Sequence, residues 1–231
     1  MTRHFLKELE KIKKMILTLG AQVEEQVQLA VQAIMQTDAK LAERIIQKDH
    51  EIDDMEVEVE EECLKVLALH QPVAVDLRFL IAVIKINNDL ERIGDEAVNI
   101  AQRVEAISRK KGIAFTFDYS TMAIKAEFML KQSLDALVNM DIDRAYRVLI
   151  LDDEVDAIKR EAYDKIKEAM RIHPDHVGYL INLLLVSRHI ERIADHSTNI
   201  AEEVVYLIDG EIVRHEIGKG ERSEERKSVR T

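Results

Sequence analysis

Two segments of the chain, one hundred positions apart, carry acidic side chains at four-residue spacing. Each segment has an acid, a second acid and an asparagine at intervals of four: Glu91, Asp95 and Asn99 in NNDLERIGDEAVNIAQRV (87–104), and Glu191, Asp195 and Asn199 in SRHIERIADHSTNIAEEV (187–204). Residues four apart lie on one face of a helix, one turn apart. Like charges at this spacing destabilise a helix by a few tenths of a kcal/mol per pair, so a compensating interaction is expected.

Each half of the chain also carries an earlier aspartate pair. The pairs are Asp49 and Asp53 in QKDHEIDDMEVE (47–58), and Asp152 and Asp156 in the second half. A turn at residues 70–73 lies about twenty residues after the first pair and about twenty before Glu91 and Asp95, and His173-Pro174 marks the corresponding turn. In antiparallel helices, equal distance from the turn means equal height, here ~30 Å from the turn. Each half therefore brings four carboxylates to one level on neighbouring helices.

Four crowded carboxylates repel one another, and a multivalent cation offsets that repulsion. Ligands that are all oxygen favour Mg²⁺, Ca²⁺, Mn²⁺ or iron, and the asparagine oxygens one turn further can complete a coordination shell. Zinc is disfavoured, because no Cys or His occupies the matching positions. The competing interpretation is a solvated acidic face, since 33% of the chain is charged. The predicted metal ligands are Asp49, Asp53, Glu91, Asp95, Asn99, Asp152, Asp156, Glu191, Asp195 and Asn199.

Two arginines and two histidines lie beside the acidic rows. Arg92 and Arg192 either pair with the carboxylates or hold an anion. His189 and His196 flank the second row, but acids take their places in the first row, so we interpret both as surface histidines.

Two further acids continue the face of the first aspartate pair. Glu56 and Glu60 stand where the second half has Lys159 and Tyr163. Because the pattern is not repeated, we interpret both glutamates as ordinary surface charges.

The elements that position these side chains are long helices. The 231-residue chain has only two Pro and seven Gly, 4% aromatic residues and many strong helix formers, and nowhere alternates with period two beside hairpin turns. Apolar residues at steps of three and four predict six helices. They span about 3–36, 39–69, 73–109, 120–139, 142–172 and 176–209.

The second half of the chain repeats the first. Asp38 matches Asp141 at an offset of 103, and the offset falls to 100 after the turns that the only two prolines, Pro72 and Pro174, mark. A repeat of this period decides the architecture. We predict an all-α protein of two similar antiparallel three-helix bundles from an internal duplication. The expected units are a first bundle at 1–112, a second at 113–210 and a charged tail at 211–231.

Composition excludes several functional classes. The net charge of −11 argues against a nucleic-acid partner. The longest apolar runs, FLIAVI (79–84) and YLINLLLV (179–186), are far shorter than the roughly 20 residues of a membrane span. The N-terminus has no signal-peptide pattern and Cys63 is the only cysteine, so we expect no intrachain disulfide and a cytoplasmic location.

The segment HQPVAVDLRFLIAVIKINNDLERIGDEAVNIA (70–101), with its recurrence as RHIERIADHSTNIAEE (188–203), resembles the signature of the PhoU family of phosphate-transport regulators. The resemblance covers about residues 3–210 and implies duplicated three-helix bundles without catalytic activity. It also implies a cytoplasmic homodimer that associates with the ATPase subunit of the phosphate ABC transporter and with a sensor histidine kinase, reaching the membrane only through these partners. Such a protein represses the phosphate-starvation response when phosphate is plentiful.

The resemblance also bears on the acidic rows. Some PhoU-like proteins bind multinuclear metal clusters through E(D)xxxD motifs, which map onto the same eight acidic residues. The second half departs from the signature, because it lacks the Asp-Leu-Arg element and has Ala194 where Gly94 stands in the first half. The equivalence of the two centres therefore does not follow from the resemblance.

Two other functional classes fit part of the pattern. The first is a ferritin-like di-metal carboxylate protein that handles iron, which normally uses Glu-x-x-His on inward-facing helices. No Glu in this chain has His three residues later, and the acidic rows are predicted to face outward. The second is a plain structural helical module whose acidic rows are simply solvated.

Overall fold

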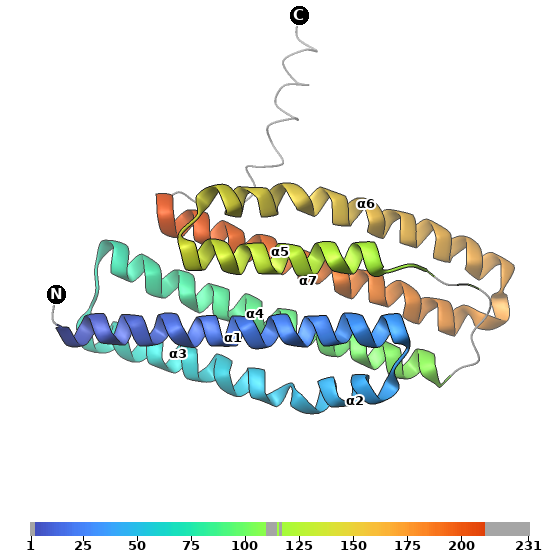
Figure 1. The fold of residues 1–231 in the computed structure, drawn as a ribbon, viewed down its shortest axis with the longest axis horizontal. Helices are drawn as coiled ribbons and strands as arrows, with labels where there is room; N and C mark the ends of the chain where they lie inside the picture. Colours follow the sequence, from blue (N-terminus) through green and yellow to red (C-terminus); the bar gives the residue numbers. More distant parts are fainter. Residues whose placement is uncertain (1–2, 110–114, 116, 211–231) are drawn as a thin grey trace, which may run out of the picture.

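A computed structural model describes residues 3–109, 115 and 117–210, and within these residues every regular element is helical (Figure 1). The elements are α1 (Arg3–Gln36), α2 (Ala39–Lys48), α3 (His50–His70), α4 (Ala74–Ser108), α5 (Ser120–Asn139), α6 (Ile142–Ile172), the 3₁₀ helix η1 (Pro174–His176) and α7 (Val177–Asp209). The predicted all-α class is confirmed. Five of the six predicted helices appear with bounds within a residue or two of those expected.

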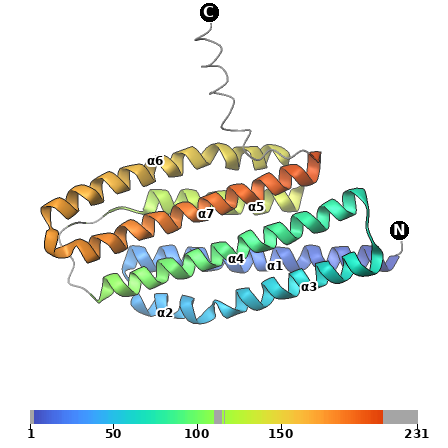
Figure 2. The same cartoon turned by 180° about the vertical axis from the view of Figure 1, so that it is seen from behind.

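The helices form two antiparallel bundles, as predicted. The first bundle contains α1 to α4, with α2 and α3 together forming one side, and the second contains α5 to α7 (Figure 1). The bundles lie side by side, with α4 packed along α7 and α1 also touching α5 (Figure 2). The predicted boundary between residues 112 and 113 and the predicted tail at 211–231 lie outside the described residues.

The second predicted helix, 39–69, was wrong in one respect: the structure divides it at Asp49. The Ile52 N–H donates to the Asp49 carbonyl at 2.8 Å, a bond of the tighter 3₁₀ type. His50 Nδ1 lies 2.9 Å from the Gln47 carbonyl oxygen, where it can take the place of a backbone donor. The equivalent helix α6 continues without a break, so only the first bundle interrupts its middle helix at an acidic-row residue.

Matching aspartates begin the middle helix of each bundle. The Asp38 carboxylate accepts hydrogen bonds from the N–H groups of Lys40 at 2.9 Å and Leu41 at 3.1 Å. Asp141 accepts from the N–H of Arg144 at 3.0 Å. Both are N-caps, which satisfy donors that the first helical turn leaves free.

The apolar stripe of α4 forms the core of the first bundle. Its members are fully buried: Ile86, Leu90, Ile93, Ala97, Ile100 and Val104. This stripe fixes the rotation of α4, because helix packing buries the apolar face and leaves the flanking faces to other contacts. As a result Glu91 lies half-buried beside α3, while Asp95, the next acid in the row, is exposed.

Described residues of the segment between the bundles pack against the second bundle. The Tyr119 hydroxyl donates to the Leu183 carbonyl at 2.5 Å, and its ring lies against Phe117 with the centroids 4.9 Å apart. Tyr119 is buried, so this contact fixes the start of α5 against α7.

Candidate metal centres and the interface between the bundles

The first acidic cluster comprises Asp49 at the break between α2 and α3, Asp53 of α3, and Glu91 and Asp95 of α4. Gln26 of α1 holds it in place, because its Nε2 donates to Asp49 Oδ1 at 3.1 Å and lies 3.4 Å from the Gly94 carbonyl. Gln26 is buried, so the side of the cluster that faces α1 is closed. Asp53 and Asp95 are exposed, so the opposite side is open to solvent.

Electrostatics show that these four acids lie close together. Burial, then the charges of Asp95 and Asp53, raises the pKa of Glu91. Burial, then Asp49 and Asp53, raises the pKa of Asp95. Burial also raises the pKa of Asp49 against the opposing effect of its hydrogen bond from Gln26. The structure thus places the four carboxylates of the first bundle within reach of one another's field.

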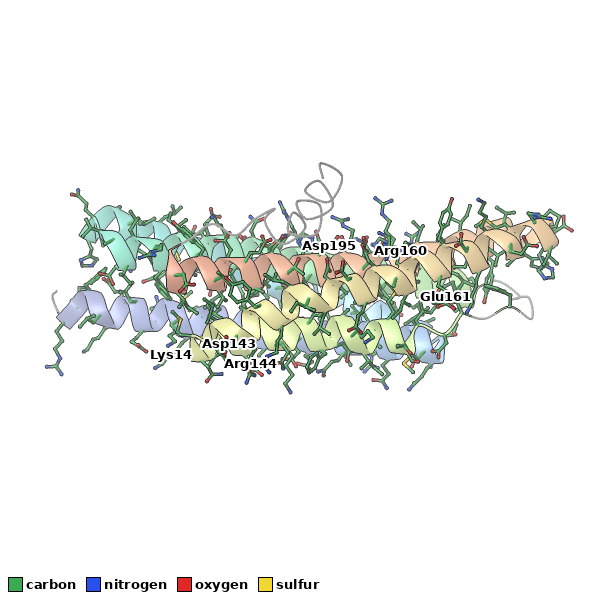
Figure 3. The ribbon with its side chains drawn as sticks, turned by 90° about the horizontal axis from the view of Figure 1, so that it is seen from above. Lys14, Asp143, Arg144, Arg160, Glu161 and Asp195 are labelled. Carbon is green, nitrogen blue, oxygen red and sulfur yellow. The ribbon has the colours of Figure 1, made fainter. Side chains whose placement is uncertain are left out.

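The second acidic cluster comprises Asp152, Asp156, Glu191 and Asp195, on α6 and α7; Figure 3 labels Asp195. Burial, then Asp195 and Asp156, raises the pKa of Asp152 to about 6. Burial, then Glu191, raises the pKa of Asp195 to about 6, while Lys159 acts in the opposite direction. The ordinary pKa is 3.8, so ionisation of these two acids destabilises the folded state. The full destabilisation is present above about pH 6, and it disappears below pH 3.8, where both acids are protonated in the folded and the unfolded chain.

The two clusters differ in their cations. Lys159 Nζ forms a very short contact with Glu191 Oε1, and Arg160 lies 3.8 Å from Asp156. Over the described ranges, no Lys or Arg side chain forms an ion pair with any acid of the first cluster. In the first cluster the cations act from further away: burial and the neighbouring acids raise the pKa values of Glu91 and Asp95, and the charges of Arg92 and Arg192 oppose this rise.

The acids of each cluster stand near one another without converging on a single point. Within the part of the chain that the structure describes, no three Asp, Glu, His or Cys side chains meet closely enough to form a metal site. The acids of both clusters offer only oxygen atoms as ligands, which suits the hard or intermediate cations expected from the sequence.

The two asparagines of the acidic rows point away from the clusters. Asn199 Nδ2 donates to Asp89 Oδ1 at 3.0 Å, and Asn99 Nδ2 lies 3.4 Å from Glu96 Oε2. Both amides therefore serve acids of the interface between α4 and α7. In this conformation Asn99 and Asn199 do not contribute to the predicted coordination shells.

The interpretation of His189 and His196 as surface histidines was wrong. Glu96 of α4 is 2% exposed, with Oε2 2.6 Å from His189 Nδ1 and Oε1 2.7 Å from Arg192. His196, itself buried, lies 2.9 Å from Asp89. Asp89 and Glu96 of α4 thus each meet a histidine of α7 across the interface between the bundles.

A signal for this pairing was present in the duplication. Positions 89 and 96 hold acids in the first half, and the matching positions 189 and 196 hold histidines in the second. A pair of antiparallel helices related by a pseudo-twofold axis brings position 89 opposite 196 and 96 opposite 189. Complementary residue types at exchanged positions indicate an interface, whereas unrelated surface positions have no reason to be complementary.

The interface also decides the role of Arg192. Burial would raise the pKa of Glu96, but the hydrogen bond from His189 and the charge of Arg192 outweigh it and hold that pKa below its usual value. Of the two functions expected for Arg192, pairing with a carboxylate is observed, with an acid of the opposite bundle. Arg92 is exposed on α4, and its proposed binding of an anion stays a prediction.

The interpretation of Glu56 as an ordinary surface charge was also wrong. Glu56 is half-buried, and Asn87 Nδ2 donates to both its side-chain Oε1 and its backbone carbonyl at 2.9 Å. Burial, then the charges of Glu60 and Asp53, raises its pKa. Asn87 stands four residues before Glu91, so the row on α4 begins one turn earlier than the acids alone suggest.

The fold and these sites define a class: tandem three-helix bundles, related by duplication and joined along their last helices, with one acidic cluster each. The PhoU domain matches residues 16–104 and 119–204, one match in each bundle. The chain belongs to the PhoU family.

Similar proteins cover nearly the whole chain. It is 37% identical to the phosphate-specific transport system accessory protein PhoU homolog of Clostridium acetobutylicum, over 92% of this chain and 98% of the relative. It is 35% identical to the homolog of the same name from Pseudomonas aeruginosa, over 93% of this chain and 89% of that relative.

Two crystal structures share the fold. PhoU from Pseudomonas aeruginosa aligns with a TM-score of 0.87 at 35% identity, over 90% of this chain and all of that chain (100%). The phosphate transport system regulatory protein PhoU from Streptococcus pneumoniae aligns with a TM-score of 0.78 at 31% identity, over 90% and 99%. Among the described helices of this chain, none is both long and apolar enough to cross a lipid bilayer.

Proposed function

We propose that this protein is an accessory regulator of a phosphate-specific transport system. It couples the ATPase subunit of the phosphate ABC transporter to a sensor histidine kinase and represses the phosphate-starvation response when phosphate is plentiful. It acts in the cytoplasm as a homodimer, is not an enzyme, and reaches the membrane only through its partners.

Similarity over the full length is the observation that carries this proposal. Relatives named phosphate-specific transport system accessory proteins match more than nine-tenths of this chain, so both bundles and the connection between them are shared. The regular elements of the described residues are all helical, and long helical surfaces suit a protein that works by binding other proteins.

Affinity capture tests the regulatory role. Tagged full-length protein is incubated with the transporter ATPase and the kinase, separately, at high and low phosphate. We expect both to be retained at high phosphate. Failure to retain either partner at high phosphate would refute the coupling, and light scattering on the same preparation decides whether the protein is a dimer.

Metal binding by the two clusters is the second part of the proposal. The raised carboxylate pKa values support it: burial is the larger cause, and the charges of neighbouring acids add a repulsion that a bound cation would remove. Asp49, Asp53, Glu91 and Asp95 would hold the ion in the first bundle, and Asp152, Asp156, Glu191 and Asp195 in the second. Iron, Mn²⁺, Mg²⁺ and Ca²⁺ all fit carboxylate oxygens.

Elemental analysis of protein purified without chelator tests this part. The comparison is between the wild type, the double variant Asp95→Ala plus Asp195→Ala, and the control Asp164→Ala, which removes an exposed aspartate outside both clusters. We expect bound metal in the wild type and the control and its loss from the double variant. Equal metal content in all three proteins would show that the clusters are not the sites. Oxygen consumption after addition of Fe²⁺ would instead support the ferritin-like alternative.

Direct binding of phosphate is a further expectation. A carboxylate-bound ion keeps positive charge, so it can hold an anion beside Arg92 in the first bundle. Arg192 already pairs with Glu96, which makes it the weaker of the two anchors. Calorimetric titration of metal-loaded protein with phosphate tests this, and the absence of saturable heat would exclude it.

A further inference from the structure

A groove between α6 and α7 combines positive charge with an apolar floor. It encloses about 580 Å³, within the range of ~300–1,000 Å³ in which proteins hold compact ligands. Its lining includes three cations, one aromatic ring and two leucines: Lys159, Arg160 and Tyr163 of α6, and Leu184, Leu185 and Arg188 of α7. The chain as a whole carries a net charge of −11, so a groove with three cations stands out from the rest of the molecule.

The duplication supplies an internal comparison for this groove. The offsets of 103 for the middle helices and 100 for the last helices relate its lining to positions in the first bundle. The three cations stand where the first bundle has Glu56, Val57 and Asn88, and Tyr163 stands where it has Glu60. A need common to both bundles would place similar residues at matching positions. The reversed charge and the added ring therefore indicate a role that belongs to the second bundle alone.

Two of the three cations are available to a ligand. Lys159 Nζ contacts Glu191 of the second acidic cluster, so its charge is already engaged. Arg160 is exposed and lies 3.8 Å from Asp156, at the outer limit of an ion pair. Arg188 is exposed and forms no ion pair with any side chain in the described part of the chain. Both guanidinium groups can therefore turn to an incoming carboxylate and bind it through two parallel hydrogen bonds.

An exposed aromatic ring borders the apolar floor. Tyr163 is 51% exposed, with Lys167 Nζ 5.7 Å from the centroid of its ring. Leu184 and Leu185 are half-buried, so their side chains are still partly in contact with water. Tyrosine and arginine are enriched among the residues that dominate binding energy at protein interfaces. A large apolar side chain of a ligand would be removed from water between the ring and the leucines.

We propose that this groove binds an acidic segment of a partner protein. A large apolar side chain of the segment packs on Leu184 and Leu185 beside Tyr163, and carboxylates on either side of it pair with Arg160 and Arg188. The net negative charge of the chain repels acidic segments elsewhere, so the local cations select the place of docking. The proposed function, regulation by binding other proteins, is the premise, and the groove adds the surface and the chemistry of one such contact.

Fluorescence anisotropy on the full chain tests the groove directly. The probe is a short fluorescein-labelled synthetic peptide in which leucine and phenylalanine lie between glutamates, and its analogue has lysine in place of each glutamate. The groove variants are Arg188→Glu and Tyr163→Ala. The control, Lys131→Glu, makes the same change of net charge as Arg188→Glu at an exposed position of α5 outside the groove. Circular dichroism confirms that each variant is folded.

We expect saturable binding of the acidic peptide and none of the lysine analogue. Arg188→Glu and Tyr163→Ala should each weaken binding by about tenfold, the effect of losing a central side chain of a small interface. Lys131→Glu should resemble the wild type. Added salt should weaken the wild type more than Arg188→Glu, because salt screens the charge pair that the variant has already lost.

Several results would overturn the proposal. They are the absence of saturable binding, equal binding of both peptides, and equal weakening by Arg188→Glu and Lys131→Glu. Binding to phosphatidylglycerol vesicles without binding to the peptide would assign the groove to a membrane surface instead. A dimer that light scattering shows to be lost in Arg188→Glu would assign it to a second copy of the chain.

Cross-linking from the groove identifies the natural segment. Asp164 also lines the groove and is exposed, whereas Cys63 is fully buried, so a thiol-specific photo-cross-linker attached to the variant Asp164→Cys reports on the groove. With the transporter ATPase and the kinase tested separately, we expect a cross-link to a segment rich in Asp and Glu that carries a large apolar residue. Capture of a partner without such a cross-link would refute the groove and leave the proposed function intact. Binding of the acidic peptide without capture of either partner would support the groove and refute the proposed coupling.

Discussion

The buried carboxylate of Glu96 should contribute strongly to holding the two bundles together. Its Oε2 lies 2.6 Å from Nδ1 of His189 and its Oε1 lies 2.7 Å from the guanidinium of Arg192, and both partners belong to the opposite bundle. Glu96→Gln keeps the shape of the side chain but removes its charge. The amide of the variant can accept from only one of the two partners through its single oxygen.

The size of the effect follows from burial. Breaking a fully buried ion pair costs about 3–5 kcal/mol, whereas a fully exposed pair is worth about 0–1 kcal/mol. The Glu96 side chain is 3% exposed, His189 14% and Arg192 44%, so one partner is half in water. We therefore expect Glu96→Gln to lower the free energy of unfolding by about 2–3 kcal/mol, below the fully buried value because of this solvent screening.

Urea unfolding followed by circular dichroism measures this change. The matched control is Glu161→Gln, which removes an exposed glutamate paired with Lys165 at i,i+4 and should cost less than about 0.5 kcal/mol. A double-mutant cycle with Arg192→Gln should give a coupling of at least about 0.5 kcal/mol. If Glu96→Gln costs no more than Glu161→Gln, the interface does not depend on this carboxylate and the reasoning fails.

The pH dependence provides a second check on Glu96. Its pKa in the folded protein lies below the ordinary 4.5, so its contribution is fully present above that pH and is lost as the pH falls through the lower folded value. The difference between wild type and Glu96→Gln should therefore be constant from pH 7 to pH 5 and shrink on further acidification. A difference that grows with acid would contradict the assigned direction.

Three other changes test local features of the fold. Gly94→Ala should stabilise the protein by up to about 1 kcal/mol, because the new Cβ would lie 3.4 Å from Ile52, an ordinary contact, and Ala is the better helix former; thermal unfolding measures it. Cys63 is fully buried and burial raises its pKa to about 12, so a thiol reagent should modify it only as fast as the protein unfolds; rapid labelling of native protein would contradict this. Asp38→Ala and Asp141→Ala should each cost about 1 kcal/mol in urea unfolding through the loss of an N-cap, and a neutral result would show that the cap bonds do not contribute.

The helices and their pairing within each bundle could be predicted because they depend on local patterns. Apolar periodicity, two prolines at matching turns and two capping aspartates set the helix ends, and the repeat set the architecture. The break at Asp49 could not be predicted in this way. Its backbone stays in the helical region, with φ −55° and ψ −40°, and no Gly or Pro marks it. At the break the Asp49 side chain accepts a hydrogen bond from Gln26 of α1, a tertiary contact that the pattern of its own helix does not reveal.

The acidic clusters were reached from the sequence by counting residues from the turns, since equal heights follow from helix geometry alone. The interface between the bundles was not predicted from the sequence. Two bundles offer many faces for association, and hydropathy does not distinguish a buried ion pair from a solvated one. Glu96 and His196 look like surface residues in the pattern of their own helices, and only the opposing helix removes them from water.

The clusters and the interface are linked by the geometry of the last helices. Asp95 and Glu96 are consecutive, as are Asp195 and His196, and consecutive side chains of a helix point about 100° apart. One therefore joins a cluster and the next joins the interface. Burial and the other cluster acids raise the pKa values of Asp95 and Asp195; the charge of Glu96 adds to the rise at Asp95, and His196 opposes the rise at Asp195. A change in the charge of a cluster should therefore change the field at the ion pairs that hold the bundles together.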